Sequence, residues 1–375
     1  MWFRRLDIYD LRNLEQVHLE LGAGLNYFYG DNGAGKTAIL EAVHLLARGR
    51  SFRTPQSAEL VRREAEHLTV RAEVDDEHRG RQDLGLARWR RGRAELRING
   101  EPGRKLSQAA ELLPLQVMGP GLSELVFGGP AGRRQWLDWG LFHVEPQYLA
   151  TLRAYLQAVR QRNAALKALA AGELPAKALA GWSEEAGRLG EAVSGRRSAY
   201  LEELTPLLLE TLASLAPGLD VTLTYGPGWK AGTALRKVLG DPGPREVKSG
   251  LTQYGPHRAD VDLRVADLAA GSTLSRGQGK ALASAMMLAQ ARHLQRTARR
   301  ASVFLIDDIG AELDLPHSGR FFSLLAELGA QVLATSNVPP EALPALPGPP
   351  VRAFHVEHGR VYPMDERGNR NEDTA

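Results

Sequence analysis

A glycine-rich loop near the N-terminus has the residue types and spacing that bind nucleotide phosphates. The pattern G-x-x-x-x-G-K-[ST] is matched by Gly30, Asp31, Asn32, Gly33, Ala34, Gly35, Lys36 and Thr37. Glycines let the backbone curl so that several N–H groups point at one phosphate. In such loops the lysine reaches the β- and γ-phosphates and the hydroxyl ligates Mg²⁺. We therefore expect these eight residues to bind ATP with Mg²⁺, with Lys36 as a catalytic residue.

Two adjacent carboxylates downstream are the candidates to complete such a site. The apolar run Val303 to Ile306 is typical of a buried parallel strand, and it ends in Asp307 and Asp308. A carboxylate at such a strand tip can hold Mg²⁺, and its neighbour can orient or deprotonate the attacking water. We expect Asp307 to join Thr37 at the metal and Asp308 to be catalytic, although a surface turn also explains many such pairs.

A third motif lies between these two. Residues 274–280 read LSRGQGK and precede a long helical pattern. Ser275 can cap that helix, whose free N–H groups favour an anion. Because the chain has a single phosphate loop, a second helix terminus directed at phosphate needs an explanation other than a second nucleotide site.

The elements that must position these residues change character along the chain. Alternating apolar and polar residues predict strands near the N-terminus and again over 68–99, and an amphipathic helix is expected over 38–47. Apolar residues at helical spacing over 148–170 and 182–208 predict an antiparallel helical hairpin. A Gly/Pro-rich stretch at 240–244 predicts a loop or a boundary.

Composition narrows the class of protein. A length of 375 residues, 43% of them hydrophobic, allows about two domains. The absence of cysteine excludes disulfides and thiolate metal sites. No secretory signal and no apolar run long enough to span a bilayer is present, so we expect a cytoplasmic protein without a membrane partner.

Arginine clusters are candidate DNA-binding surfaces. One contains Arg50 and Arg53, and another contains Arg90 and Arg91. A net charge of +3 permits DNA binding through a local patch but does not demand it, and a solvated basic face is the commoner explanation of such clusters. The aromatic content of 6% argues against extensive base stacking, so contact with a duplex backbone is favoured.

The order of the motifs resembles that of ABC-type ATPase heads. The phosphate loop, the LSxGQ segment, the apolar strand ending in two acids and a loop like residues 311–314 follow one another as in that class. The resemblance implies an α/β head with a mixed sheet and a head-to-tail homodimer that sandwiches two ATP molecules. Ser275, Gly277 and Gln278 would then contact ATP in trans.

The two halves of this head are far apart in the sequence, and the helical hairpin lies between them. This layout resembles the chromosome-maintenance and DNA-repair branch more than transporter subunits. We expect a discontinuous ATPase head over 1–115 and 250–363, an inserted helical arm domain over 116–249 and a disordered tail over 364–375.

Further segments resemble the RecF family of bacterial recombination-repair proteins. They are Arg50 to Thr54, Gly129 to Trp139, Phe142 to Pro146 and Tyr254 to Arg258. The resemblance implies a slow, DNA-dependent ATPase that closes as a dimer on duplex DNA at gaps or junctions, and it implies RecR as a partner, with RecO and RecA in the pathway. The alternatives are an energising subunit of a membrane transporter and a DNA tether whose hydrolysis is incidental.

Three positions depart from the pattern of ABC-type heads. Arg276 stands where transporter heads usually have glycine, and Asp308 is one methylene shorter than the usual glutamate. Residues 334–337 lack the usual switch histidine. The last two departures predict slow turnover, with ATP acting mainly as a dimerisation switch.

Overall fold

The computed structural model describes residues 1–312, 315–342 and 351–364. The chain folds into two compact units, which are described separately below. Unit 1 comprises residues 1–122, 214–216 and 284–375, and unit 2 comprises residues 123–213 and 217–283. Nearly all of the predicted disordered tail, and residues 313–314 of the loop after the second acidic pair, lie outside the described residues.

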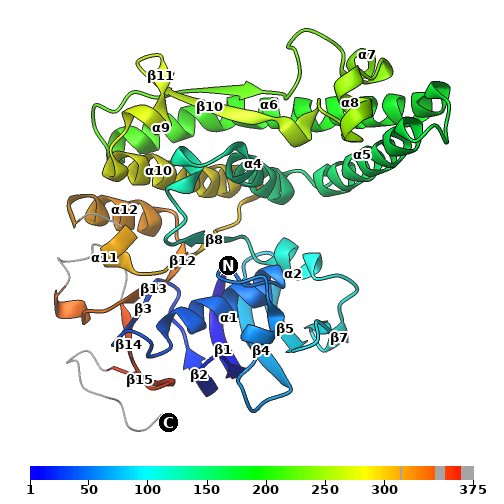
Figure 1. Ribbon diagram of the computed structural model, residues 1–375. Coiled ribbons are helices and arrows are strands. Elements are labelled where there is room, and N and C mark those ends of the chain that lie inside the picture. The colour runs from blue at the N-terminus through cyan, green and yellow to red at the C-terminus, as the bar shows by residue number, and fades with distance from the viewer. Residues whose placement is uncertain (313–314, 343–350, 365–375) are drawn as a thin grey trace. The chain divides into compact units, whose positions relative to one another are not determined.

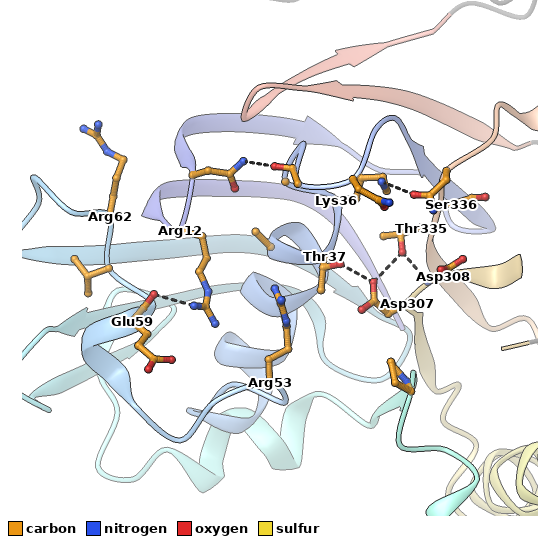
Figure 2. A pocket seen from close by; sticks show the side chains of 18 of the residues that line it. Arg12, Lys36, Thr37, Arg53, Glu59, Arg62, Asp307, Asp308, Thr335 and Ser336 are labelled. Carbon is orange, nitrogen blue, oxygen red and sulfur yellow. Dashed lines mark hydrogen bonds between the residues drawn. The ribbon is translucent and has the colours of Figure 1, made fainter. Parts of the chain in front are cut away.

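A mixed sheet in unit 1 carries the phosphate loop and the acidic pair (Figure 1). Its strand order is β15-β14-β3-β13-β12-β8, and all strands but the edge strand β15 run parallel. The bounds are β3 Leu25–Tyr29, β8 Leu115–Met118, β12 Val303–Ile306, β13 Gln331–Ser336, β14 Arg352–Glu357 and β15 Arg360–Pro363. The carboxyl ends of β3, β13 and β12 meet at one edge, beside the pocket drawn in Figure 2.

An antiparallel sheet forms the rest of the core of unit 1. Its order is β2-β1-β4-β5-β6-β7, with bounds β1 Trp2–Leu11, β2 Leu14–Glu20, β4 His67–Asp76, β5 Gly80–Trp89, β6 Ala94–Ile98 and β7 Glu101–Pro102. These strands confirm the alternating patterns. The turn at Asn99 and Gly100 has positive φ at both residues, as a tight hairpin turn requires.

Helix α1 (Lys36–Arg48) follows the phosphate loop and is buried almost along its whole length. It contacts strands of both sheets, and its apolar residues join theirs in one hydrophobic cluster. Burial on all sides fixes the helix firmly, so the loop at its N-terminus is held by the core. The other helices that lie wholly in unit 1 are η1 Ser57–Glu59, α2 Ser107–Leu112, α11 Ile309–Glu312, α12 Leu315–Glu327 and η4 Pro340–Ala342.

Unit 2 is mainly helical, and it contains the predicted hairpin. Helices α5 (Tyr148–Ala170) and α6 (Ala180–Leu215) are antiparallel neighbours, because Thr151 bonds Arg196 whereas Arg162 bonds Ser183. The other helices are α3 Glu124–Phe127, α4 Pro130–Val144, η2 Ala176–Leu179, α7 Leu235–Gly240, α8 Pro244–Ser249, η3 Pro256–Arg258, α9 Ala270–Thr273 and the start of α10, Arg276–Ala298. Among the described residues, no helix combines the length and hydropathy needed to cross a bilayer.

The division into units differs from the predicted domain boundaries. A small sheet in unit 2 has the order β11-β10-β9, with bounds β9 Thr222–Gly226, β10 Asp260–Val265 and β11 Leu268–Ala269. Because β10 pairs with β9, residues 250–283 lie in unit 2 rather than with the phosphate loop. The other boundary falls after Leu122 rather than before residue 116, since β8 pairs with β12 in the mixed sheet.

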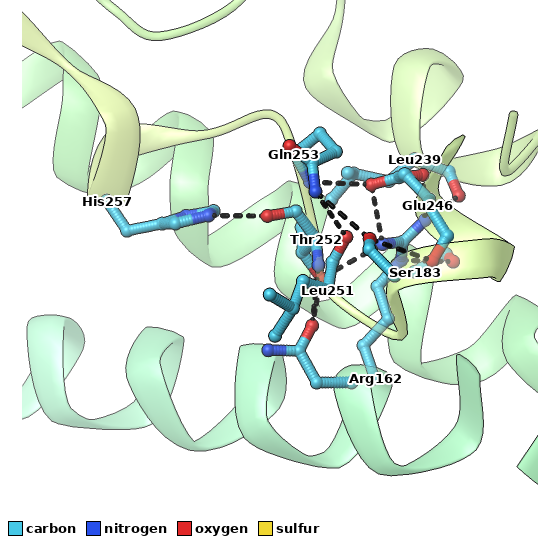
Figure 3. Close-up of polar contacts among 10 residues, drawn as sticks. Arg162, Ser183, Leu239, Glu246, Leu251, Thr252, Gln253 and His257 are labelled. Atoms are coloured by element: carbon cyan, nitrogen blue, oxygen red, sulfur yellow. Dashed lines mark hydrogen bonds and ion pairs between the residues drawn. The ribbon is translucent and has the colours of Figure 1, made fainter. Parts of the chain in front are cut away.

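A buried ion pair joins α8 to the hairpin (Figure 3). Arg162 is fully buried and donates to both carboxylate oxygens of Glu246, at 3.1 and 3.0 Å. It also donates to the hydroxyls of Ser183 and Thr252 and to the carbonyl of Leu239, at 3.0 to 3.1 Å. Every polar group of the pair therefore has partners, as a buried charge requires.

Replacing one partner of this pair should destabilise unit 2 strongly. Glu246→Ala leaves the guanidinium of Arg162 buried without its carboxylate, which costs about 3–5 kcal/mol. Denaturant unfolding followed by circular dichroism measures this loss. As a control, Glu185→Ala removes an exposed ion pair with Arg188 and should leave the midpoint unchanged. Equal midpoints for the two variants would show that the buried pair contributes nothing special.

Candidate nucleotide site

The phosphate loop lies between β3 and α1, and its glycines are required by geometry. Gly30, Gly33 and Gly35 have φ of +148°, +80° and +120°, a region that side chains rarely adopt. A Cβ on Gly30 would lie 2.1 Å from the carbonyl oxygen of Val356. The loop therefore takes the curled form that its sequence predicts, with α1 beginning at Lys36.

The Lys36 ammonium is held inside the loop by oxygen atoms. Its Nζ donates to the carbonyls of Gly30 at 2.7 Å and Asp31 at 2.9 Å, and to Oδ1 of Asn337 at 2.9 Å. Burial lowers the pKa of Lys36, and the nearby charges of Asp308 and then Asp307 oppose that shift. Phosphate oxygens can take the place of these three acceptors, because they accept the same hydrogen bonds.

The predicted acidic pair lies at the same place (Figure 2). Thr37 Oγ1 donates to Asp307 Oδ1 at 2.8 Å, and Thr335 Oγ1 donates to the same oxygen at 2.9 Å. Hydroxyl and carboxylate oxygens this close together are hard ligands, so Thr37 and Asp307 fit Mg²⁺. The contact joins two residues that are 270 positions apart in the sequence.

Asp308 has an unusual backbone conformation. Its φ is +62°, in the left-handed region that aspartate tolerates better than most residues. Its backbone N–H donates to Thr335 Oγ1 at 2.8 Å. Thr335 thus bonds both to the carboxylate of Asp307 and to the main chain of Asp308, and Asp308 lines the same pocket.

The pocket is open and about 760 Å³ in volume, and several of its residues were not predicted from the sequence. Asn13, in the turn between β1 and β2, donates from Nδ2 to the carbonyls of Gly33 and Ala34, both at 3.1 Å. Thr335, in β13, and Asn337, just after β13, also line the pocket. A polar Thr-Ser-Asn run at the end of an apolar strand was the available signal, because parallel strands bring their carboxyl ends to one edge.

Four arginines also line this pocket: Arg12, Arg53, Arg62 and Arg63. They come from the β1–β2 turn and from residues 53–63, outside the phosphate loop itself. Cationic side chains beside a phosphate loop suit a polyanionic ligand. Of this group, only Arg53 was singled out from the sequence, and as a DNA contact.

The LSRGQ segment begins α10 in unit 2 and forms the predicted cap. The Ser275 hydroxyl accepts the N–H of Gln278 at 3.3 Å, and Gln278 Oε1 accepts the N–H of Ser275 at 3.0 Å. This reciprocal pair is a capping box. Both residues are exposed. The polar side chains assigned to ATP in trans thus stand at the surface, at a helix N-terminus.

The predicted DNA-contacting arginines have different surroundings. Arg50 and Arg91 are exposed. Arg90 is partly buried and donates to the carbonyls of Ala65, at 2.9 Å, and of Arg62. Its guanidinium therefore bonds to the protein's own backbone instead of pointing into solvent.

Fold and site together define an ABC-type P-loop ATPase head. The family model described as "RecF/RecN/SMC N terminal domain" matches residues 2–341. The protein named "DNA replication and repair protein RecF" from Shewanella piezotolerans is 39% identical over 364 residues, 96% of this chain and 99% of that protein. Its namesake from Shewanella oneidensis is 39% identical over 357 residues, 95% and 98% of the two chains. The chain belongs to the RecF family.

Solved structures confirm the predicted fold class. A structure of the recombination mediator protein RecF with ATP, in the RecFOR pathway, has a TM-score of 0.86 at 24% identity and covers 97% of this chain and 98% of that one. An Smc head bound to the C-terminal winged-helix domain of ScpA has a TM-score of 0.60 at 14% identity, with 98% of each chain covered. The family model and the curated relatives confirm the resemblance to the RecF family stated from the sequence.

A buried histidine in α1 should make stability depend on pH. Burial lowers the pKa of His44 from 6.5 to about 4, and its Nδ1 donates to the carbonyl of Arg50 at 2.6 Å. The folded state holds this histidine neutral, so its contribution is present above pH 6.5 and is lost as the pH falls towards 4. The loss should reach about 3 kcal/mol. Unfolding free energies measured from pH 7 to 4 should have a smaller slope in His44→Phe.

The exposed His358 supplies the control. His358→Asn should keep the slope of the unsubstituted chain, since it leaves the buried His44 in place. A slope that His44→Phe leaves unchanged would contradict the buried, neutral state of His44.

Proposed function

We propose that this chain is an ATP-dependent DNA-binding protein of recombinational repair. Two copies sandwich ATP and Mg²⁺ head to tail and close on duplex DNA at gaps or junctions, and slow hydrolysis releases them. The observation that carries this proposal is the exposed capping box of Ser275 and Gln278, in a chain with one phosphate loop. In a dimer, that helix N-terminus would contact the ATP bound to the second copy.

The phosphate-loop residues divide the work in this proposal. Backbone N–H groups of Gly30 to Thr37 bind the phosphates, and Lys36 exchanges its three oxygen acceptors for phosphate oxygens. Thr37 and Asp307 hold Mg²⁺, which neutralises charge on the β- and γ-phosphates when bound. Asp308 orients the attacking water and accepts its proton. Its short side chain, and Asn337 in place of a histidine, are the reasons to expect slow turnover.

Ser275, Gly277 and Gln278 contact the γ-phosphate of the partner copy's ATP. Breaking the reciprocal cap frees the Ser275 hydroxyl and the Gln278 carboxamide for that contact, and the phosphate replaces them at the helix N-terminus. Dimerisation therefore depends on bound ATP, whereas each phosphate loop can bind ATP before a second copy arrives.

Duplex DNA is the proposed ligand of the closed dimer. The curated relatives carry the name of a DNA replication and repair protein, which supports this function over the transporter alternative. Arg50 and Arg91, which are exposed, are the candidate contacts with the duplex backbone, whereas Arg90 is engaged with carbonyl groups. RecR is the proposed partner, with RecO and loading of RecA in the same cytoplasmic pathway.

The test compares DNA binding with and without ATP. ATP with Mg²⁺ should raise the affinity for duplex and gapped DNA roughly ten-fold or more, as an allosteric coupling of a few kcal/mol does. Lys36→Met should abolish that increase. Asp308→Asn should keep it, because ATP binding remains while hydrolysis slows. Fluorescence anisotropy over a salt series measures each affinity.

Two results would count against this function. One is a DNA affinity that ATP does not change in the unsubstituted chain. The other is an ATP effect of full size in Lys36→Met. Arg50→Ala and Arg91→Ala should reduce the slope of log affinity against log salt by about one each if they contact phosphates.

A further inference from the structure

A fully buried carboxylate lies in α1, one turn after Thr37. Glu41 has no exposed surface, and it accepts Arg12 Nε at 2.9 Å through Oε2 and Arg12 Nη2 at 3.0 Å through Oε1. Apolar side chains surround this position along the helix. A buried carboxylate is costly unless strong partners accompany it, so the fold keeps Glu41 at a cost that an apolar residue would not have.

The Arg12 guanidinium is fixed from more than one side. Besides the two bonds to Glu41, its Nη1 donates to the carbonyl of Glu59 at 3.0 Å. The backbone of Arg12 has φ of +57°, and its N–H bonds to the carbonyl of Leu60 at 2.8 Å. This residue lines the pocket with about a quarter of its side chain exposed (23%). Arg12 therefore presents a guanidinium of fixed position to a ligand in the pocket.

Glu41 also holds the loop that follows α1. The hydroxyl of Ser51 donates to Glu41 Oε1, and the same hydroxyl accepts the N–H of Arg53 at 2.9 Å and of Thr54 at 3.1 Å. Arg53 is exposed and lines the pocket, and Figure 2 shows it rising from this loop beside Thr37. One carboxylate thus bonds, directly or through Ser51, to two segments that each bring an arginine to the pocket.

We propose that Glu41 is a positioning residue of the nucleotide site. It holds Arg12 and the Arg53 loop against the helix that carries Lys36 and Thr37, so that both guanidinium groups face the polyphosphate of a bound nucleoside triphosphate. This inference rests on the proposed function, since it takes the pocket to be the nucleotide site. Glu41 does not line the pocket and acts through its partners.

Calorimetric titration with ATP and Mg²⁺ tests the proposal. Glu41→Gln keeps the shape of the side chain but loses the charge that orients the guanidinium, and ATP affinity should fall roughly ten-fold. In an Arg12→Ala/Arg53→Ala background, the same substitution should cause no further loss, because the groups through which it acts are gone. This dependence on background separates positioning from stability alone.

The matched control is Glu246→Gln, another buried carboxylate paired with a buried arginine. It should lower the unfolding midpoint much as Glu41→Gln does and leave ATP affinity unchanged. If Glu41→Gln does not fold, Ser51→Ala serves instead. It frees only the loop, so ATP affinity should fall about three-fold, and the loss should vanish in an Arg53→Ala background.

The outcomes that overturn the proposal are distinct from failure of the nucleotide site. An unchanged ATP affinity in Glu41→Gln overturns it, as does a loss that persists in the Arg12→Ala/Arg53→Ala background. An unchanged affinity in Ser51→Ala overturns it where Glu41→Gln does not fold. If the unsubstituted chain does not bind ATP, or if Lys36→Met binds it equally well, the proposed function itself fails and takes this inference with it.

Discussion

The parallel pairing of β3, β13 and β12 is the constraint on which the site depends. Tyr29 pairs with Ser336, and Ile306 pairs with Ala334, so the three strands end at nearly the same level. Gly30 and Asp307 follow directly, and Asn337 comes after Ser336. A slip of one residue along any strand would turn its side chains to the opposite face and separate Thr37 from Asp307. Burial of every residue in β12 and β13 resists that slip.

Hydrogen bonds at this edge pair its polar groups with one another. Lys36 donates to three oxygen atoms at 2.7 to 2.9 Å, and Thr37 bonds to the carboxylate with which it would share a metal. A phosphate or a metal would therefore exchange partners with groups that are already paired. At the rim of the pocket, the guanidinium of Arg12 is likewise already paired, with the carboxylate of Glu41.

Local chemistry explains what the sequence could predict. Gly30 to Thr37, the strand that ends in Asp307 and the capping serine at 275 are each specified by a few adjacent residues, and the structure gives all three the expected backbone. The helical hairpin follows in the same way from spacing within each helix. Their roles with ATP remain proposals.

Contacts between distant segments explain what the sequence could not predict. Lys36 and Asn337 are 301 positions apart, and Arg12 and Glu41 are 29 apart in different elements. Residues 250–283 lie in unit 2 rather than in the predicted head, because β10 pairs with β9, and the partner of a strand is not specified by its own pattern. The Arg90 guanidinium, expected at DNA, donates instead to backbone carbonyls. No periodicity reveals such partners.

The central claim is that one chain holds half of a nucleotide site and a second copy supplies the rest. Light scattering with ATP and Mg²⁺ on Asp308→Asn, chosen to slow hydrolysis, tests it most directly. The account predicts the chain mass of 40.9 kDa without nucleotide and twice that mass with it. Adding Ser275→Arg to the same variant should keep ATP binding and leave the mass at one chain. A dimer that forms equally well with Ser275→Arg, or a single-chain mass at saturating ATP without it, would contradict the account.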